Sequence, residues 1–205
     1  MEVIPIVSLF CGPGGMDLGF RKAGFTTILA LDSSQAAVET YNWNARSEVA
    51  RKCDLSELTG DDLARMVREV CRAQSPRGVI AGPPCQSFSR GNTQKKRRDP
   101  RARLGLAYAQ LVRTLNEEFG LDFMLFENVV ELRTERHSHR FQIIQRELRR
   151  AGFNLFVSEL EASEFGVPQH RRRLLIVGIN REKFPWVRFE FPTGSVHSCF
   201  TNLRS

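Results

Sequence analysis

Short apolar runs alternate with amphipathic helical patterns along most of this chain. Such alternation predicts a mostly parallel β-sheet with helices on both faces, which is an α/β fold. Sheets of this kind bind ligands at the carboxyl ends of their strands. The strands are expected at residues 6–11, 26–32, 51–54, 78–82, 122–126, 153–160 and 173–180, and the helices at 16–22, 35–44, 61–73, 104–119 and between Ser138 and Gly152.

The bulk composition bounds the class of protein. A length of 205 residues suits one domain with a full core, with the alternating pattern in residues 1–180 and an irregular tail in 181–205. The five cysteines are odd in number and show no C-x-x-C spacing, which argues against a zinc cluster or a disulfide framework and suits a reducing cytoplasm or nucleus. No membrane-spanning run or secretory leader is expected. A net charge of +7 suits a polyanionic partner, although solubility alone would also explain it.

The segment Gly-Pro-Pro-Cys-Gln occupies residues 82–86, directly after the apolar run of residues 79–81. Pro83 and Pro84 fix two φ angles and end a strand, so Cys85 is expected at the strand tip. A thiol presented on a stiff turn is placed as a nucleophile would be. The alternative for this motif taken alone is a small buried cysteine without chemistry.

Glycines gather after the first expected strand, in Phe-Cys-Gly-Pro-Gly-Gly, residues 10–15. Gly12, Gly14 and Gly15 allow the backbone to turn tightly and to approach a ligand closely. The motif occurs in many nucleotide and cofactor folds, and the glycines could instead serve the turn alone.

Acidic residues stand at the ends of the next two expected strands. Asp32 can accept hydrogen bonds from both hydroxyls of a ribose, or cap the helix that follows. Asp54 can accept one from an adenine amine while Leu55 packs on the ring. Taken alone, Asp54 is more simply a turn or cap residue.

A carboxyl group and a run of arginines complete the candidate site. Glu127 follows the apolar run of residues 123–126, so it is expected beside Cys85, where it could give a proton; otherwise it caps a helix or forms a salt bridge. Arg171 and Arg173 precede a buried run and share one face of a strand. Their fixed donors suit a carbonyl oxygen or a phosphate, although charge runs are usually solvated.

Together these motifs resemble the cytosine-5 DNA methyltransferase family. The glycine motif, Pro-Pro-Cys-Gln, Glu-Asn-Val at 127–129 and Gln-x-Arg-x-Arg at 169–173 stand in the family's order. The segment at 98–104 resembles the one that follows the nucleophile, so the resemblance runs over residues 6–180. It implies the Rossmann-like fold of S-adenosylmethionine-dependent methyltransferases.

The resemblance implies S-adenosylmethionine as the cofactor and no metal. Asp32 would hold the ribose, and Asp54 the adenine amine. Pro83 would belong to the same cofactor set, while its carbonyl oxygen would accept from the exocyclic amine of the target base. Phe10 would stack on the adenine, and the glycines would approach the methionine part.

The resemblance also implies double-stranded DNA as substrate, with the target cytosine flipped out of the stack. The Cys85 thiolate would add to carbon 6, which makes carbon 5 nucleophilic. Glu127 would protonate or hydrogen-bond ring nitrogen 3, where negative charge develops. Arg173 would hold the ring carbonyl, with Arg171 supporting it or a phosphate. The loop at 86–103 would close over DNA, with Lys95, Lys96, Arg97 and Arg98 near phosphates.

Family members continue into a target-recognition domain and a returning segment that completes the cofactor pocket, and this sequence contains neither. Three interpretations follow: the catalytic half of a split or partner-dependent enzyme, which would bind a second chain or self-associate; a non-catalytic remnant or regulatory binding fold; or a relative of the branch that methylates transfer RNA. The intact set of Cys85, Glu127 and Arg173 favours the first.

Overall fold

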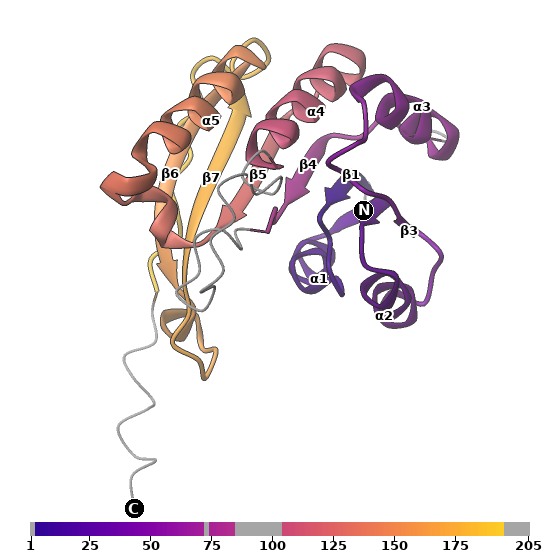
Figure 1. Ribbon diagram of the computed structural model, residues 1–205, viewed down its shortest axis with the longest axis horizontal. Coiled ribbons are helices and arrows are strands. Elements are labelled where there is room, and N and C mark those ends of the chain that lie inside the picture. Colours follow the sequence, from indigo (N-terminus) through magenta and orange to yellow (C-terminus); the bar gives the residue numbers. More distant parts are fainter. Residues whose placement is uncertain (1–2, 72–73, 85–103, 195–205) are drawn as a thin grey trace, which may run out of the picture.

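The computed structural model describes residues 3–71, 74–84 and 104–194. Within these ranges the chain forms one seven-stranded sheet with helices on both faces (Figure 1). The strands are β1 (Ile4–Leu9), β2 (Phe25–Asp32), β3 (Ala50–Lys52), β4 (Gly78–Ala81), β5 (Phe123–Asn128), β6 (Phe153–Glu161) and β7 (Arg172–Asn180). The α-helices are α1 (Gly15–Lys22), α2 (Gln35–Ala45), α3 (Gly60–Val70), α4 (Leu104–Phe119) and α5 (Ser138–Arg150), and 3-10 turns occur at η2 (Val130–Arg133), η3 (Glu135–His137) and η4 (Ala162–Phe165).

The sheet has the order β3-β2-β1-β4-β5-β7-β6. Strands β1 to β5 are parallel, as the alternating pattern predicts. Strand β7 is antiparallel to both β5 and β6, and the sequence pattern did not indicate which strand would be reversed. Only a short connection joins β6 to β7, and such a connection can join only antiparallel neighbours. The sheet is therefore mostly parallel, with one reversed strand.

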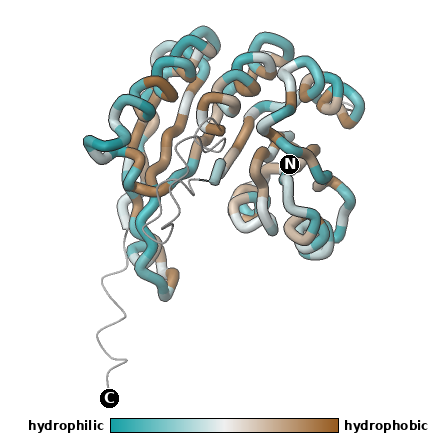
Figure 2. The backbone as a smooth tube through the Cα atoms, viewed as in Figure 1, coloured by the Kyte–Doolittle hydropathy of each residue, from teal (hydrophilic) through white to brown (hydrophobic). Residues whose placement is uncertain are grey.

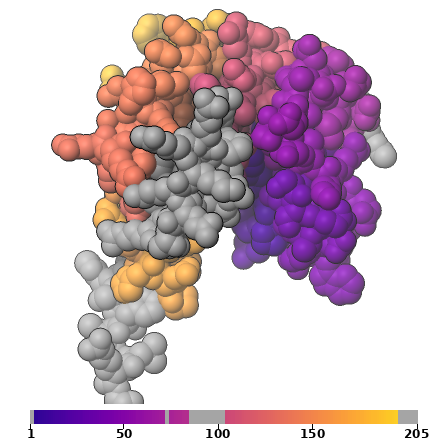
Figure 3. All heavy atoms as spheres, in the orientation of Figure 1, coloured from indigo at the N-terminus to yellow at the C-terminus, as the bar shows by residue number. Residues whose placement is uncertain are grey.

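Helices cover the two faces of the sheet unequally. Helices α3, α4 and α5 lie along one face, whereas α1 and α2 lie on the other, near β1, β2 and β3 (Figure 1). Hydrophobic residues concentrate in the strands, whereas the helices show many hydrophilic residues (Figure 2). In a space-filling view, the elements before β4 and the β6–β7 hairpin lie on opposite sides of the visible face (Figure 3).

Strand β5 shows how the pleat separates core from site. Met124 and Phe126 are fully buried in the main core, and the Phe126 ring lies 5.6 Å from that of Tyr108 on α4. Phe123, of the opposite parity, stacks on Phe20 of α1 with 6.2 Å between centroids. Glu127 shares the parity of Phe123, so its side chain projects from the α1 side of the sheet.

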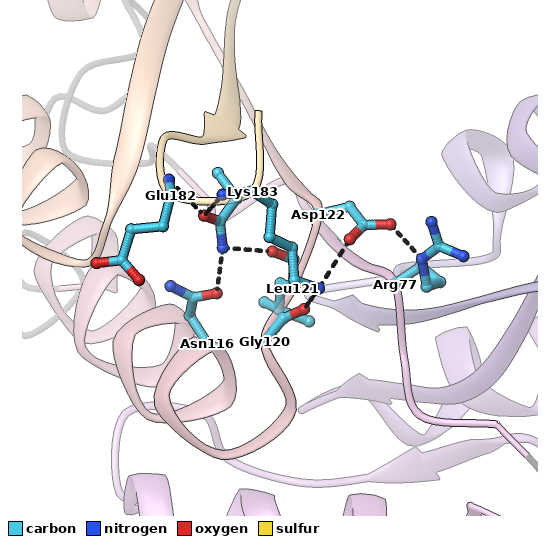
Figure 4. A network of polar contacts seen from close by, with 8 residues as sticks. Arg77, Asn116, Gly120, Leu121, Asp122, Glu182 and Lys183 are labelled. Atoms are coloured by element: carbon cyan, nitrogen blue, oxygen red, sulfur yellow. Dashed lines mark hydrogen bonds and ion pairs between the residues drawn. The ribbon is translucent and has the colours of Figure 1, made fainter. Parts of the chain in front are cut away.

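A polar cluster fixes the opposite edge of the sheet, at the amino ends of β4 and β5 (Figure 4). The Nδ2 of buried Asn180 donates to the Leu121 carbonyl at 2.7 Å and to Asn116 Oδ1 at 3.1 Å. Asp122 pairs with Arg77 and, at 2.9 Å, with Lys183. These contacts join the end of β7 to α4 and β5, so the reversed strand is anchored away from the candidate site.

Beyond β7, the described residues 181–194 form turns and irregular chain without a helix or strand. Phe189 lies against Phe156 of β6, with 6.2 Å between ring centroids, whereas Trp186 is 91% exposed. Within the described ranges, no helix has the length and apolar character needed to cross a bilayer.

Candidate active site

The glycine motif forms a tight loop between β1 and α1. Its backbone takes positive φ angles at Phe10 (54°), Gly12 (53°) and Gly14 (91°). A positive φ at a residue as bulky as Phe10 is strained, and such strain clusters at ligand sites. A Cβ built on Gly12 or Gly15 would meet no atom within 4 Å, so the space beside the loop is open to a ligand.

Asp32 ties this loop to the end of β2. Its Oδ2 accepts from the Gly12 amide at 2.9 Å, and its Oδ1 accepts from the Ser34 amide at 2.9 Å. The N-cap of α2 is Ser34, whose Oγ accepts from the Ala37 amide at 3.3 Å. An ionised carboxylate has about four lone-pair positions, so each oxygen of Asp32 can still accept from a ribose hydroxyl.

Asp54 lies at an exposed turn after β3. Its Oδ1 accepts from the amide and the hydroxyl of Ser56, at 2.9 and 2.7 Å, and these bonds lower the pKa of Asp54. Neither bond involves Oδ2. Leu55 is only 2% exposed and packs in the main core, so little of its side chain is available to contact an adenine ring. After β3, Asp54 is therefore a turn residue and Leu55 a core residue.

The residues that surround the loop suit S-adenosylmethionine. An acid stands at the end of β2, a second acid follows β3, and the backbone at Gly12 and Gly15 has open space beside it. These positions are where the cofactor's ribose, adenine and methionine parts were expected. The described residues contain no group of three His, Cys, Asp or Glu side chains placed to hold a metal ion.

Glu127 and two arginines meet at the carboxyl end of β5. Arg173 Nε lies 2.8 Å from Glu127 Oε1, and Arg171 Nη2 lies 3.9 Å from the same oxygen. The side chains of Glu127 and Arg173 are 23% and 26% exposed, so the pair is partly desolvated. The expectation that Arg171 and Arg173 share one face agrees with these contacts.

Arg172 lies on the opposite face and takes no part in this group. Its Nη2 contacts Glu159 Oε2 at 2.8 Å, and Arg133 of η2 contacts the other oxygen of Glu159 at 3.0 Å. The three consecutive arginines thus divide by strand parity between two acidic partners.

The Pro-Pro turn is fixed against the end of β5. A Cβ built on Gly82 would lie 3.3 Å from Glu127 Oε2, and the Asn128 amide donates from Nδ2 to the carbonyl oxygen of Pro83 at 3.1 Å. The turn before Cys85 is therefore held directly beside Glu127. Cys85 and the basic segment with Lys95, Lys96, Arg97 and Arg98 lie outside the described residues.

Two buried polar residues of the site escaped the sequence reasoning. Asn128 is 5% exposed, and its only signal was its place in Glu-Asn-Val. Asp17 is also 5% exposed, and it lies three residues before Phe20, on the inward face of α1. The partners of Asp17 come from β1, β2 and α2, so no local pattern in the sequence marked it.

Asp17 accepts hydrogen bonds from three hydroxyl groups. Ser8 Oγ donates to Oδ2 at 2.8 Å, while Thr27 Oγ1 and Tyr41 OH donate to Oδ1 at 2.7 and 2.9 Å. Burial together with the charge of Asp17 raises the pKa of Tyr41, so its phenol stays a donor. Burial, Asp17 and Asp32 also raise the pKa of the Cys11 thiol to about 12.

Comparison with known proteins places the chain in one family. The family model for C-5 cytosine-specific DNA methylase matches residues 4–203. The type II methyltransferase M.FnuDI of Fusobacterium nucleatum is 34% identical over 91% of this chain and 50% of its own length. M.AquIA of a Picosynechococcus strain is 32% identical over 91% of this chain and 75% of its own length.

Solved structures agree with the fold. A prophage-encoded E. coli protein assigned as a DNA modification methyltransferase superposes with a TM-score of 0.73 at 26% identity, over 88% of this chain and 47% of that one. The S. pombe Dnmt2 methyltransferase gives 0.68 at 22% identity, over 93% and 52% of the two chains. The chain spans about half the length of most of these relatives. The motifs, the sheet and these matches together establish that the chain belongs to the C-5 cytosine-specific DNA methylase family.

Proposed function

We propose that this chain is the catalytic part of an S-adenosylmethionine-dependent DNA methyltransferase that acts on carbon 5 of cytosine and needs a second polypeptide for target recognition. The observation that carries the proposal is the position of Glu127. It lies between Arg173, at 2.8 Å, and the Gly82 backbone that leads into Cys85. An acid and a fixed cation thus meet beside the turn that leads to the candidate nucleophile.

The bound cofactor would supply an electrophilic methyl group, held by Asp32, Asp54 and the glycine loop. Cys85 would add to carbon 6 of a flipped-out cytosine and later leave when the carbon 5 proton is removed. Glu127 would hold or donate a proton at ring nitrogen 3, where negative charge develops during the addition.

Arg173 would act first by orienting Glu127. Its Nε contacts Glu127, and its Nη1 donates to the Arg172 carbonyl at 2.8 Å. A guanidinium has five N–H groups, so donors remain for the carbonyl oxygen of the cytosine ring. Arg171 is more exposed, at 48%, and could reach either Glu127 or a DNA phosphate.

One observation supports dependence on a partner. On the α1 side of the sheet, Leu175 lies opposite Glu127 and Ile179 opposite Phe123, and neither is fully buried. These partly exposed apolar side chains would offer a contact to a second chain.

The test is transfer of a tritiated methyl group from S-adenosylmethionine to mixed-sequence double-stranded DNA, with and without lysate from the source organism. Label at carbon 5 of cytosine that requires lysate, and that Cys85→Ser and Glu127→Gln each abolish, would support the proposal. Label without lysate would show that the chain needs no second polypeptide for methyl transfer. Cofactor binding with no label under either condition would indicate a non-catalytic protein, and label on RNA alone would indicate a different substrate.

A further inference from the structure

Asp17 is a buried carboxylate that the proposed chemistry does not use. It is 5% exposed and is held by hydroxyl groups from β1, β2 and α2. Within the described part of the chain, no Lys or Arg forms an ion pair with it. An ionised carboxylate in such surroundings is unfavourable unless hydrogen bonds or a helix dipole compensate it.

The position of Asp17 provides both forms of compensation. It lies in the first turn of α1, where the positive end of the helix dipole favours a negative charge. Its three hydroxyl donors are 2.7 to 2.9 Å away and approach from separate elements. An apolar side chain could fill the same volume, but it could not fix the start of α1 relative to three neighbours at once.

Tyr41 connects this carboxylate to the glycine loop. Its hydroxyl donates to Asp17, while its ring lies so close to Gly14 that a Cβ there would be 2.9 Å from Cδ2. Gly14 is the residue that precedes α1 and has a φ of 91°. The loop is thus held at Gly12 by Asp32 and at Gly14 by Tyr41, which Asp17 orients.

We propose that Asp17 is a positioning residue for the cofactor: through Ser8, Thr27 and Tyr41 it holds the Gly12–Gly15 loop in the conformation that receives the methionine end of S-adenosylmethionine. The inference rests on the proposed function, because it names the cofactor of that function. Asp17 does not touch the cofactor in this account; it acts through the loop.

The test compares Asp17→Asn with Asn180→Ala. The first variant keeps the shape of the side chain but removes its charge and one acceptor oxygen. The second removes a buried polar group at the opposite edge of the sheet, where it contacts Asn116 and Leu121. S-adenosylhomocysteine affinity is measured by calorimetry well below both melting temperatures, and amide hydrogen exchange is followed at residues 12–18.

We expect Asp17→Asn to weaken S-adenosylhomocysteine binding by about tenfold or more and to speed exchange at residues 12–18. Asn180→Ala should lower the melting temperature but leave both readouts unchanged. Tyr41→Phe, which keeps the ring on Gly14, should give a smaller loss of affinity. Equal affinity and equal loop exchange in Asp17→Asn and the wild type would overturn the inference, even if the melting temperature falls.

The exchange readout separates this inference from the proposed function. If the wild type binds no S-adenosylhomocysteine, the proposed function fails in its choice of cofactor, and with it the cofactor role of Asp17. Faster loop exchange in Asp17→Asn would still show that this carboxylate positions the loop.

Discussion

Arg173 makes the shorter of the two arginine contacts to Glu127, and the neighbouring Arg172 provides a control on the same strand. Arg173 meets Glu127 at 2.8 Å, whereas Arg172 meets Glu159 on the other face at the same distance. Lysine keeps the charge of an arginine but loses the fixed planar donors.

We therefore expect Arg173→Lys to lower the methylation rate by about 10²-fold or more, the scale on which a fixed donor contributes to a transition state. Arg172→Lys should stay within about twofold of the wild type, because exposed pairs contribute little. Methyl transfer under single-turnover conditions, in the presence of the recognition partner, measures both. Equal losses in the two variants would contradict the assigned orientation.

The Cys11 thiol gives a prediction about alkaline stability. Its pKa is raised to about 12 in the folded protein, chiefly by burial and then by Asp17 and Asp32. An unfolded thiol loses its proton near pH 8.5. Between these values the folded state holds one more proton than the unfolded state, so the free energy of unfolding falls as the pH rises.

This fall should be less steep in Cys11→Ala than in the wild type, by up to about 1.4 kcal/mol per pH unit. Urea denaturation at intervals from pH 8 to pH 11 gives both slopes. Parallel slopes would mean that Cys11 titrates alike in the folded and unfolded states.

At the scale of the element, the β1–α1 loop distinguishes two glycines that the sequence treats alike. Gly14 has a φ of 91° and faces the Tyr41 ring, whereas Gly15 begins α1 and faces open space. Gly14→Ala should destabilise the fold by at least about 1–2 kcal/mol, while Gly15→Ala should stay within about 0.5 kcal/mol of the wild type. Chemical denaturation compares them, and similar losses would contradict the loop geometry.

The same loop shows where sequence patterns stop being informative. Residues 6–11 were expected as the first strand because Phe10 and Cys11 are apolar, yet β1 ends at Leu9 and Phe10 turns away with a φ of 54°. Likewise, the sequence pattern predicts a strand that includes Asp54, but β3 ends at Lys52. The hydrogen bonds from Ser56 to Asp54 form a turn instead. Hydrophobicity locates an element, whereas local hydrogen bonds and sterics end it.

The elements that periodicity defines were found from the sequence, and α4 has the predicted bounds Leu104–Phe119. The reversed direction of β7 was not found, because residue pattern does not record strand direction. The places of Asp32 and Glu127 at the ends of β2 and β5 followed from the positions of those strands in the sequence. Asp17 and Asn128 were missed because their partners, Tyr41 and Pro83, are brought near only by the fold.

At the scale of the whole molecule, the incompletely covered face beside β7 predicts self-association of the free chain. Ile179 lies on this face, away from the arginines at the start of β7. Ile179→Lys should shift sedimentation toward a monomer, because a charge on an apolar contact opposes its burial. Val187→Lys, at a position 45% exposed beyond β7, is the matched control. A monomeric wild type at micromolar concentration would contradict this prediction.

The insertion of β7 between β5 and β6 has a consequence for biosynthesis. On the ribosome, β5 emerges long before β7, and until β7 arrives its outer edge has no strand to pair with. Unpaired edges invite association with other chains. The same late strand carries Arg173 to Glu127. Pairing with β7 therefore covers the edge of β5 in the same event that brings Arg173 to Glu127, and a chain released before residue 172 would have neither a paired β5 nor this acid–arginine pair.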